Sequence, residues 1–415
     1  MKLEYAVAVD FGSTTLAFRL VEMQSKKSIH TVTMLNSQRK FGADVLTRIC
    51  ASVDGKRDEL RQCARLDLAT GIARLMEECK KEQEQKGREQ KELEQKEQEQ
   101  KGREQIELEQ KEQEQKEQEQ IKHVVIAGNT AMVHFLQGYD CSGLGSYPFT
   151  PVNLEFVNTT AKTLGLHINR SEMAREKEAD TSDITIFPGI SAFIGGDIVS
   201  GLYALDFINK EEISLLIDLG TNGEMVLGNR NRAIAASVAA GPAFERGAVI
   251  WGSDVIDITS RLLREGIMDE TGLLMEQYFD KGYPVSQTED GRQIFFTQQD
   301  IRKLQLAKAA VRAGIETLIE EYGIVAEQID KVYLAGGFGY YLDAKKAAFI
   351  GMIPQELAEK TESVGNSSLA GCVKYLQNAC AEEDIKRIVS TVSHVELANN
   401  DNFQKKYVKN MLFSL

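Results

Sequence analysis

Residues 215–229 read LLIDLGTNGEMVLGN, and residues 7–23 read VAVDFGSTTLAFRLVEM. Each stretch is an apolar run that ends in an aspartate, then a loop of glycine with hydroxyl or amide residues, then a second apolar run. Two apolar runs joined by such a loop are typical of a β-hairpin. The sequence therefore predicts two similar hairpins, one in each half of a 415-residue chain that is long enough for two domains.

Both hairpin loops have the composition of a phosphate-binding loop. Glycine lets the backbone approach a phosphate closely, and consecutive N–H groups in such a turn form a concavity that binds anions. Asp10 and Asp218 are negatively charged like phosphate itself, so their expected role is to hold Mg²⁺ or one of its waters. A single turn of this kind is often only a tight hairpin, but the pair favours binding. The candidate phosphate-binding residues are Gly12, Ser13, Thr14, Thr15, Gly220, Thr221, Asn222 and Gly223.

A third glycine-rich element, KVYLAGGFGYYLDA, occupies residues 331–344. We expect its first residues to form a strand that leads into a glycine-rich turn before a helix. Such a turn leaves room for a flat base against the backbone, so Gly336, Gly337 and Phe338 are expected to border an adenine. Neither a P-loop nor a Rossmann fingerprint occurs in the sequence, which leaves a nucleotide site built from the two hairpins.

These three elements, in this order, resemble the phosphate-1, phosphate-2 and adenosine motifs of the ASKHA superfamily, which includes acetate and sugar kinases, Hsp70 and actin. The matching residues are DFGSTT, DLGTNGE and AGGFG. The resemblance implies a two-lobed, actin/Hsp70/sugar-kinase-like α/β fold of the ribonuclease H-like kind, with mixed sheets and an interlobe nucleotide cleft. We expect lobe I at 1–210, with helices from about Asp44, Leu66 and Gly196, and lobe II at 211–415.

Further segments narrow the resemblance to the ATP-dependent reductive activators of corrinoid proteins. They cover nearly the whole chain outside residues 81–120, and the superfamily in general does not require them. The resemblance implies an ATPase that uses ATP and Mg²⁺ to promote reduction of Co(II) to Co(I) in a corrinoid protein, and it suggests a homodimer. The segments are NSQRKFGADVLTRI (36–49), VVIAGNTAMVHFLQG (124–138), FIGGDIVSGL (193–202), AAGPAFE (239–245), DIRKLQLAKAAVRAGIETL (300–318) and VELANNDNFQKKYVKNMLF (395–413).

The cysteines bear on the source of the electrons. The six cysteines are scattered and form no C-x-x-C pair. Activators of this family often carry an N-terminal plant-type [2Fe–2S] module, whose cluster needs a C-x₄-C-x₂-C run. Because no such run occurs, we expect no iron–sulfur cluster in this chain and electrons from a separate, ferredoxin-like donor.

The composition is that of an ordinary globular protein, 42% hydrophobic and 27% charged, with a formal net charge of −13. Nucleic-acid binding needs a basic surface, so this charge argues against a nucleic-acid partner. The small basic cluster of Arg39, Lys40 and Arg48 is most simply a solvated helix face, or else a docking surface for an acidic partner. The N-terminal apolar run is too short for a signal peptide, and no run is long enough to span a bilayer. We therefore expect a cytoplasmic protein with no membrane partner.

Residues 81–120 are eight five-residue units of the KEQEQ type, with nine Lys and Arg against fourteen Glu. A five-residue period rotates by about 140° per unit on a helix, so it makes no continuous apolar stripe. Glu82 and Lys86 are spaced i,i+4 in the order that favours a helix. We predict a solvated, partly helical arm, frayed at Gly87 and Gly102, with disorder as the alternative and no chemistry of its own.

The group that orients the attacking water is less well defined by the sequence. Glu245 is the catalytic candidate and Asn129 a candidate nucleotide contact, while Glu224 and Asp197 also lie near glycines at strand or loop ends. For each of these residues, capping or turn stabilisation is the commoner role. His134 is more typical of a packed core than of metal ligation.

Three functions remain open at this stage. The first is the reductive activator that the whole-chain resemblance implies. The second is a small-molecule kinase of the acetate or sugar-kinase type, for which no base beside the γ-phosphate can be identified. The third is a non-catalytic module that senses a nucleotide and binds a partner. An activator of the 2-hydroxyacyl-CoA dehydratase type is disfavoured, because no cysteine lies in a glycine-rich loop suited to a shared [4Fe–4S] cluster.

Overall fold

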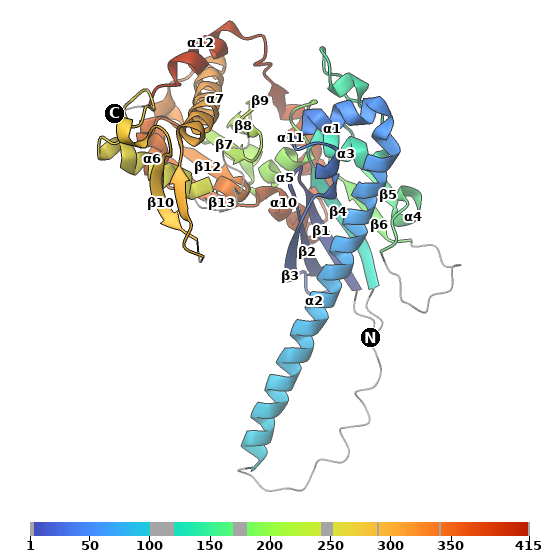
Figure 1. Cartoon of the computed structure of the whole chain (residues 1–415). Coiled ribbons are helices and arrows are strands. Elements are labelled where there is room, and N and C mark those ends of the chain that lie inside the picture. The colour runs from blue at the N-terminus through green and yellow to red at the C-terminus, as the bar shows by residue number, and fades with distance from the viewer. Residues whose placement is uncertain are drawn as a thin grey trace. The chain divides into compact units, whose positions relative to one another are not determined.

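The computed structural model describes residues 4–99, 120–168, 181–241, 252–288, 290–339 and 342–413. The chain forms two compact units, each with a six-stranded sheet and helices (Figure 1). Unit 1 is Met1–Phe187 with Cys372–Ala379, and unit 2 is Pro188–Gly371 with Cys380–Leu415. The predicted α/β class with mixed sheets is confirmed. The compact units divide after Phe187. They are defined by contacts within the chain, and the lobe boundary expected after residue 210 stays a prediction.

The sheet of unit 1 has the strand order β3-β2-β1-β4-β6-β5. Its first three strands form an antiparallel meander, in which β1 and β2 are the first predicted hairpin. β4 pairs in parallel with β1, β6 pairs in parallel with β4, and β5 closes the edge in the antiparallel sense. Burial of nearly every residue of β1 marks it as a central strand. The strands are β1 (Glu4–Phe11), β2 (Thr15–Glu22), β3 (Ser28–Leu35), β4 (Gln120–Gly128), β5 (Val157–Thr160) and β6 (Asp183–Ile186).

The helices of unit 1 begin and end where the sequence offers caps. Asp44 caps α1 (Val45–Ala51) by accepting a hydrogen bond from the Thr47 N–H at 2.8 Å, so this helix begins as predicted. Asn129 caps α3 (Thr130–Gln137), which ends at a glycine in the left-handed conformation. A short helix, α4 (Ala161–Leu164), follows β5.

The long helix α2 (Arg57–Glu99) begins nine residues before the predicted start near Leu66. Its first turns are mostly polar, but Leu60, Cys63 and Ala64 are buried at helical spacing. They extend toward the N-terminus the buried stripe that continues at Leu68 and Ile72. The charged residues among them conceal this first part of the helical pattern in the sequence. α2 continues without interruption through Gly87, so the fraying predicted there is not found. Gly102 lies outside the described residues.

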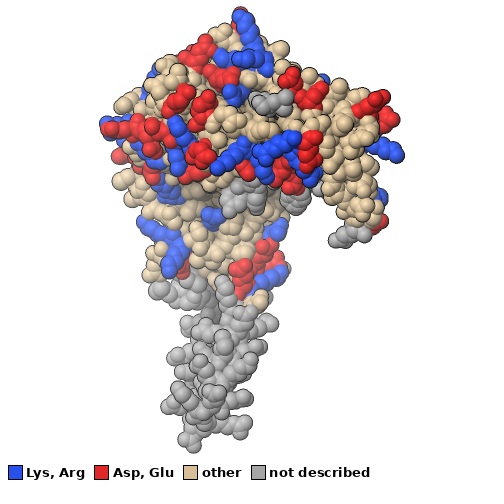
Figure 2. All heavy atoms as spheres, turned by 90° about the vertical axis from the view of Figure 1, so that its left-hand side faces the viewer, with Lys and Arg blue, Asp and Glu red and all other residues tan. Residues whose placement is uncertain are grey.

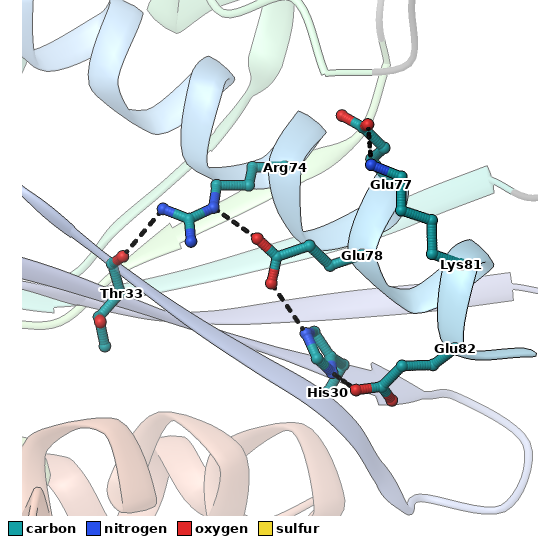
Figure 3. Close-up of polar contacts among 7 residues, drawn as sticks. All are labelled: His30, Thr33, Arg74, Glu77, Glu78, Lys81 and Glu82. Carbon is teal, nitrogen blue, oxygen red and sulfur yellow. Dashed lines mark hydrogen bonds and ion pairs between the residues drawn. The ribbon is translucent and has the colours of Figure 1, made fainter. Parts of the chain in front are cut away.

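Figure 3 shows how polar contacts join α2 to β3 near the beginning of the charged repeat. The imidazole of His30, on β3, has one ring nitrogen 3.2 Å from Glu78 and the other 3.2 Å from Glu82. Arg74 donates to Glu78 at 2.6 Å and to the Thr33 carbonyl at 3.3 Å. Since several of these side chains are exposed, water and salt screen the ion pairs, and the buried apolar residues of α2 supply most of the stability.

The sheet of unit 2 has the order β13-β12-β7-β8-β9-β14. Its antiparallel meander β9-β8-β7 continues in parallel through β12 and β13, as β3-β2-β1 continues through β4 and β6 in unit 1. The two units thus repeat one topology around the two predicted hairpins. The strands are β7 (Ser214–Leu219), β8 (Gly223–Gly228), β9 (Ala233–Val238), β12 (Lys331–Ala335), β13 (Thr361–Gly365) and β14 (Val392–His394).

The helices of unit 2 include those predicted around 254–265 and 300–321. The second of these, α7, starts with a capping box of Thr297 and Asp300. The helix that begins at Gly196, which we expected in lobe I, belongs to unit 2. A small hairpin of β10 (Tyr283–Gln287) and β11 (Gln293–Phe296) precedes α7. The helices are α5 (Gly196–Ala204), α6 (Gly252–Arg264), α7 (Gln298–Tyr322), α8 (Gly336–Gly339), α9 (Ala344–Phe349), α10 (Ser367–Gln377, which ends in unit 1), α11 (Ala381–Thr391) and α12 (Asp401–Lys409).

Among the described residues, charged side chains of both signs are interspersed over the face of the molecule drawn in Figure 2. Within the part of the chain that the structure describes, no helix combines the length and the apolar character needed to cross a membrane.

Candidate functional site

The first hairpin carries Asp10 at the penultimate position of β1. Asp10 is paired across the sheet with Ala17 on β2 and with Ala127 on β4, so the aspartate lies on a central strand at the edge where the loop begins. The loop itself must have glycine at its first position, because a Cβ on Gly12 would lie 2.5 Å from the Thr15 carbonyl oxygen. The predicted hairpin, with its carboxylate at the tip, is confirmed.

The carbonyl oxygens of the first loop are held by two buried side chains that follow β3. The Asn36 amide donates to the Gly12 carbonyl at 2.9 Å, and Arg48 Nη1 donates to the Ser13 carbonyl at 2.7 Å. The expectation of a solvated helix face at Arg48 is wrong, since none of its surface is exposed, whereas Arg39 and Lys40 are exposed. Sequence reasoning missed this role because nothing in the local pattern separates Arg48 from its exposed neighbours.

Asn129 stands where β4 leads into α3, beside the first hairpin. Its side chain accepts a hydrogen bond from the Ala131 N–H at 3.0 Å, which is the capping role considered as the alternative to ligand contact. The preceding Gly128 permits close approach of β4 to β1, because a Cβ there would lie 2.7 Å from the Phe11 carbonyl oxygen. The backbone around Asn129 is therefore close to the end of β1 within unit 1.

The second hairpin carries Asp218 at the same penultimate position, here on β7. Asp218 is paired with Glu224 on β8 and with Ala335 on β12. The loop is closed by its own backbone, since the Gly220 N–H donates to the Asn222 carbonyl at 2.9 Å. The second predicted hairpin is thus also confirmed, and its aspartate occupies the place in unit 2 that Asp10 occupies in unit 1.

Three carboxylates of unit 2 interact at the second hairpin. Burial raises the pKa of Glu224 well above its ordinary value of 4.5, and the negative charges of Asp197 and Asp218 raise it further. The Ser237 hydroxyl donates to Glu224 Oε1 at 3.3 Å. Asp197 lies in the first turn of α5, so elements far apart in sequence bring these groups together. The three carboxylates repel one another here, and a divalent cation would weaken that repulsion.

The glycine-rich element after β12 lies against this carboxylate cluster. Gly336 has φ of +86°, and a Cβ on it would lie 2.7 Å from Asp218 Oδ1 and 2.5 Å from the Leu219 carbonyl oxygen. Only glycine combines this backbone conformation with such close approach. The predicted turn is a single helical turn, α8, in which Gly337 is exposed and has open space around it.

Some predicted site residues cannot be placed by side-chain contacts. Glu245 lies in 242–250, outside the described residues, and nothing is described of the Phe338 side chain. In the ranges described, no group of three or more His, Cys, Asp and Glu side chains is arranged to hold a metal ion. His134 is fully buried, with Nδ1 2.8 Å from the Thr130 carbonyl, which confirms the core role predicted for it.

Two units of one repeated topology, each with an aspartate-bearing hairpin, define the ASKHA class of proteins. The family comparison agrees with this. A family model described as the RACo middle region matches residues 5–89 and 84–210. A second, described as the C-terminal domain of RACo, the ASKHA domain, matches 212–253 and 247–415. The chain belongs to the RACo family of reductive activators, as the sequence resemblance implied.

Individual relatives agree with this assignment. The chain is 26% identical over 461 aligned positions to the corrinoid activation enzyme RamQ of Eubacterium limosum, covering 99% of this chain and 70% of that protein. It is 28% identical over 288 aligned positions to the [Co(II) methylated amine-specific corrinoid protein] reductase of Methanosarcina barkeri. That alignment covers 57% of this chain and 53% of the reductase. A solved reductive activator for corrinoid, iron-sulfur protein matches with a TM-score of 0.79 and 29% identity, covering 99% of this chain and 66% of that one. The chain therefore spans between 53% and 70% of the length of these relatives.

Proposed function

We propose that this chain is an ATP-dependent reductive activator of a corrinoid protein. It binds and hydrolyses Mg·ATP and thereby promotes the one-electron reduction of Co(II) to Co(I) in its partner. The electron comes from a separate, ferredoxin-like donor. The observation that carries the proposal is the match along nearly the whole chain to a solved reductive activator. Two relatives add support, since one is named a corrinoid activation enzyme and the other a reductase of a Co(II) corrinoid protein.

The residues of both hairpins suit a magnesium nucleotide. In the proposal, Asp218 and Asp10 hold Mg²⁺ or one of its waters. Support comes from the carboxylates around Asp218, since burial raises the pKa of Glu224 and the charges of Asp197 and Asp218 raise it further. The phosphates would be held by Gly12, Ser13, Thr14, Thr15, Gly220, Thr221, Asn222 and Gly223, the adenosine by Asn129, Gly336, Gly337 and Phe338, and the attacking water would be oriented by Glu245.

The chemistry assigned to this chain is mainly positioning and charge neutralisation. Bound Mg·ATP supplies a polyphosphate whose hydrolysis releases free energy. Reduction of Co(II) is uphill with ordinary cellular donors, and each ~59 mV of a one-electron step corresponds to about 1.4 kcal/mol. A nucleotide can contribute only if it binds two conformations of the activator with different affinity. Hairpins on rigid central strands can transmit such a preference to the rest of their units.

The test is anaerobic absorbance of a Co(II) corrinoid protein from the same genome, mixed with a chemical reductant and this chain. We expect the Co(I) spectrum to appear only when Mg·ATP is present, and EDTA or a non-hydrolysable ATP analogue to prevent its accumulation. Hydrolysis of ATP without reduction of cobalt would contradict the proposal and favour the small-molecule kinase or the nucleotide sensor.

Three further parts of the proposal concern the setting of the protein. We place it in the cytoplasm, as a homodimer, and without a nucleic-acid partner. Light scattering on a gel-filtration column tests the homodimer, since a monomer at the concentration used in the cobalt assay would contradict it. Fractionation of the native cells tests the location.

A further inference from the structure

The segment 36–49 resembles the activator family, yet none of its residues is among those assigned above to the metal, the phosphates or the adenosine. In the structure it runs from the end of β3 through α1 and lies directly against the first hairpin loop. Asn36 and Arg48, near its two ends, are both buried. Both side chains donate hydrogen bonds to carbonyl oxygens of the first hairpin loop.

Three consecutive carbonyls of the loop accept hydrogen bonds from the segment. The Asn36 amide donates to Gly12 at 2.9 Å, the Asn36 backbone N–H donates to Thr14 at 2.9 Å, and Arg48 donates to Ser13 at 2.7 Å. In a planar trans peptide, the C=O and the following N–H point in opposite directions. Holding the Gly12 and Ser13 carbonyls toward the segment therefore directs the N–H groups of Ser13 and Thr14 to the opposite side.

Arg48 also places a positive charge at the rear of this loop. Its side chain is 0% exposed, and its Nε donates to the Gly42 carbonyl at 2.9 Å. Burying a guanidinium is costly even when its donors are satisfied, because the charge loses its hydration. An apolar side chain of similar length would fill the same space without that cost. The arginine is thus better explained by its charge and its fixed donor geometry than by packing.

Asp44 is the carboxylate that acts on Arg48 from its own segment. Its pKa is lowered first by the hydrogen bond from the Thr47 N–H, and Arg48 is the smallest of the causes. Asp44 is mainly occupied as the cap of α1, where it accepts from both the N–H and the hydroxyl of Thr47. An anion held by the outward N–H groups of the first loop would share the field of the same arginine.

We propose that Arg48, assisted by Asn36, is a positioning residue of the first phosphate loop. It holds the loop carbonyls inward, so that the N–H groups face the phosphates of the nucleotide, and it adds a buried positive charge behind them. It acts through the loop backbone and does not touch the nucleotide. The inference rests on the proposed function for the identity of the anion, Mg·ATP, but the support of the loop is a property of the free protein.

The test compares Arg48→Met, Arg48→Lys and Asn36→Ala with Arg39→Met, an exposed arginine of the same segment. Calorimetry measures the dissociation constants of Mg·ATP and of adenosine at two salt concentrations. We expect Arg48→Met to weaken Mg·ATP binding by at least about tenfold and adenosine binding by no more than about twofold. Arg48→Lys should recover part of the loss, and Arg39→Met should bind like the wild type.

Hydrogen exchange measured by mass spectrometry gives a second readout that needs no nucleotide. Peptides that cover residues 12–15 should exchange faster in Arg48→Lys and Asn36→Ala, while peptides of unit 2 exchange as in the wild type. These milder variants carry the test if Arg48→Met does not fold. Unchanged loop exchange, or an equal loss of adenosine and Mg·ATP binding, would overturn the inference. A wild type that binds no Mg·ATP would overturn the proposed function, while the loop exchange would still decide the role of Arg48.

Discussion

The two hairpin loops have the same sequence pattern and the same place in their sheets, but their surroundings have opposite charge. The carbonyls of the first loop are held by a buried cation, Arg48, and by Asn36. The second loop closes on its own backbone and borders a carboxylate cluster of Asp197, Asp218 and Glu224. A buried positive charge thus lies behind the first loop, and three interacting carboxylates lie at the second.

This difference shows that a duplicated motif does not imply duplicated surroundings. Both aspartates are penultimate residues of a central strand, so they occupy equivalent positions in their sheets. The divergence comes partly from the motif, since Asp10 faces Ala17 whereas Asp218 faces Glu224. It also comes from outside the motif, from the segment after β3 in unit 1 and from the helix α5 in unit 2.

The largest expected effect is the loss of activity on neutralising either aspartate. Asp10→Asn and Asp218→Asn should each lower ATP-dependent cobalt reduction by about a hundredfold or more, because metal-ion stabilisation of a phosphoryl transfer amounts to several kcal/mol. If the cation belongs to the second loop, Asp218→Asn should weaken Mg²⁺ binding more than Asp10→Asn. Steady-state kinetics against Mg²⁺ concentration measures both effects. Equal Mg²⁺ dependence in the two variants would contradict the assignment of the cation to the second loop.

The second prediction concerns the glycine that packs on Asp218. Gly336→Ala should destabilise the folded protein by about 1–3 kcal/mol, since alanine is strained at φ of +86° and its Cβ would contact Asp218 Oδ1. Gly337→Ala is the matched control, because a Cβ there meets nothing within 4 Å. Urea unfolding followed by circular dichroism measures the difference. Equal stability of the two variants would show that the second loop can move away from α8 at little cost.

The third prediction gives the sign of the pH dependence at the carboxylate cluster. Since the pKa of Glu224 is raised in the folded state, the folded protein binds the extra proton, and stability falls as the pH rises above the unfolded value of about 4.5. Glu224→Gln removes this titration, so its stability relative to the wild type should increase with pH, by at most about 1.4 kcal/mol per pH unit.

Urea unfolding in EDTA, from about pH 5 to about pH 8, measures this effect. The exposed Glu265→Gln is the control and should keep the pH profile of the wild type. If the stability of Glu224→Gln followed the same pH dependence as that of the wild type, the pKa of Glu224 would not be raised in the metal-free protein. The contrast between the two loops would then reduce to the presence of Arg48 alone.

The smallest effect is expected far from both loops. Replacing residues 86–119 by a short Gly-Ser linker should change Mg·ATP affinity by no more than a few fold, because a repeat of this composition offers no apolar face and carries no site residue. Calorimetry with Mg·ATP measures it. A large loss would show that this arm supports the first hairpin, to which the preceding part of α2 is joined through β2 and β3.

Local sequence patterns were enough to predict both hairpins, the strands around them and most helices. A strand that ends in Asp before a glycine loop carries its information within about ten residues, as at Asp10 and Asp218. The start of α2 was missed because its first apolar stripe consists of a few residues at helical spacing among charged ones. The capping role of Asn129 was foreseen as an alternative, since capping is also a local interaction.

The sequence by itself thus determined the class of fold, the two hairpins and the positions of their aspartates, because apolar periodicity and turn chemistry are properties of neighbouring residues. Only the tertiary structure decided that Arg48 is buried behind the first loop while Arg39 stays exposed. It also decided that Asp197 interacts with Glu224, although α5 and β8 are separated along the chain. The physical reason is that burial and electrostatic coupling depend on which elements pack together, and residues distant in sequence meet only in the folded chain.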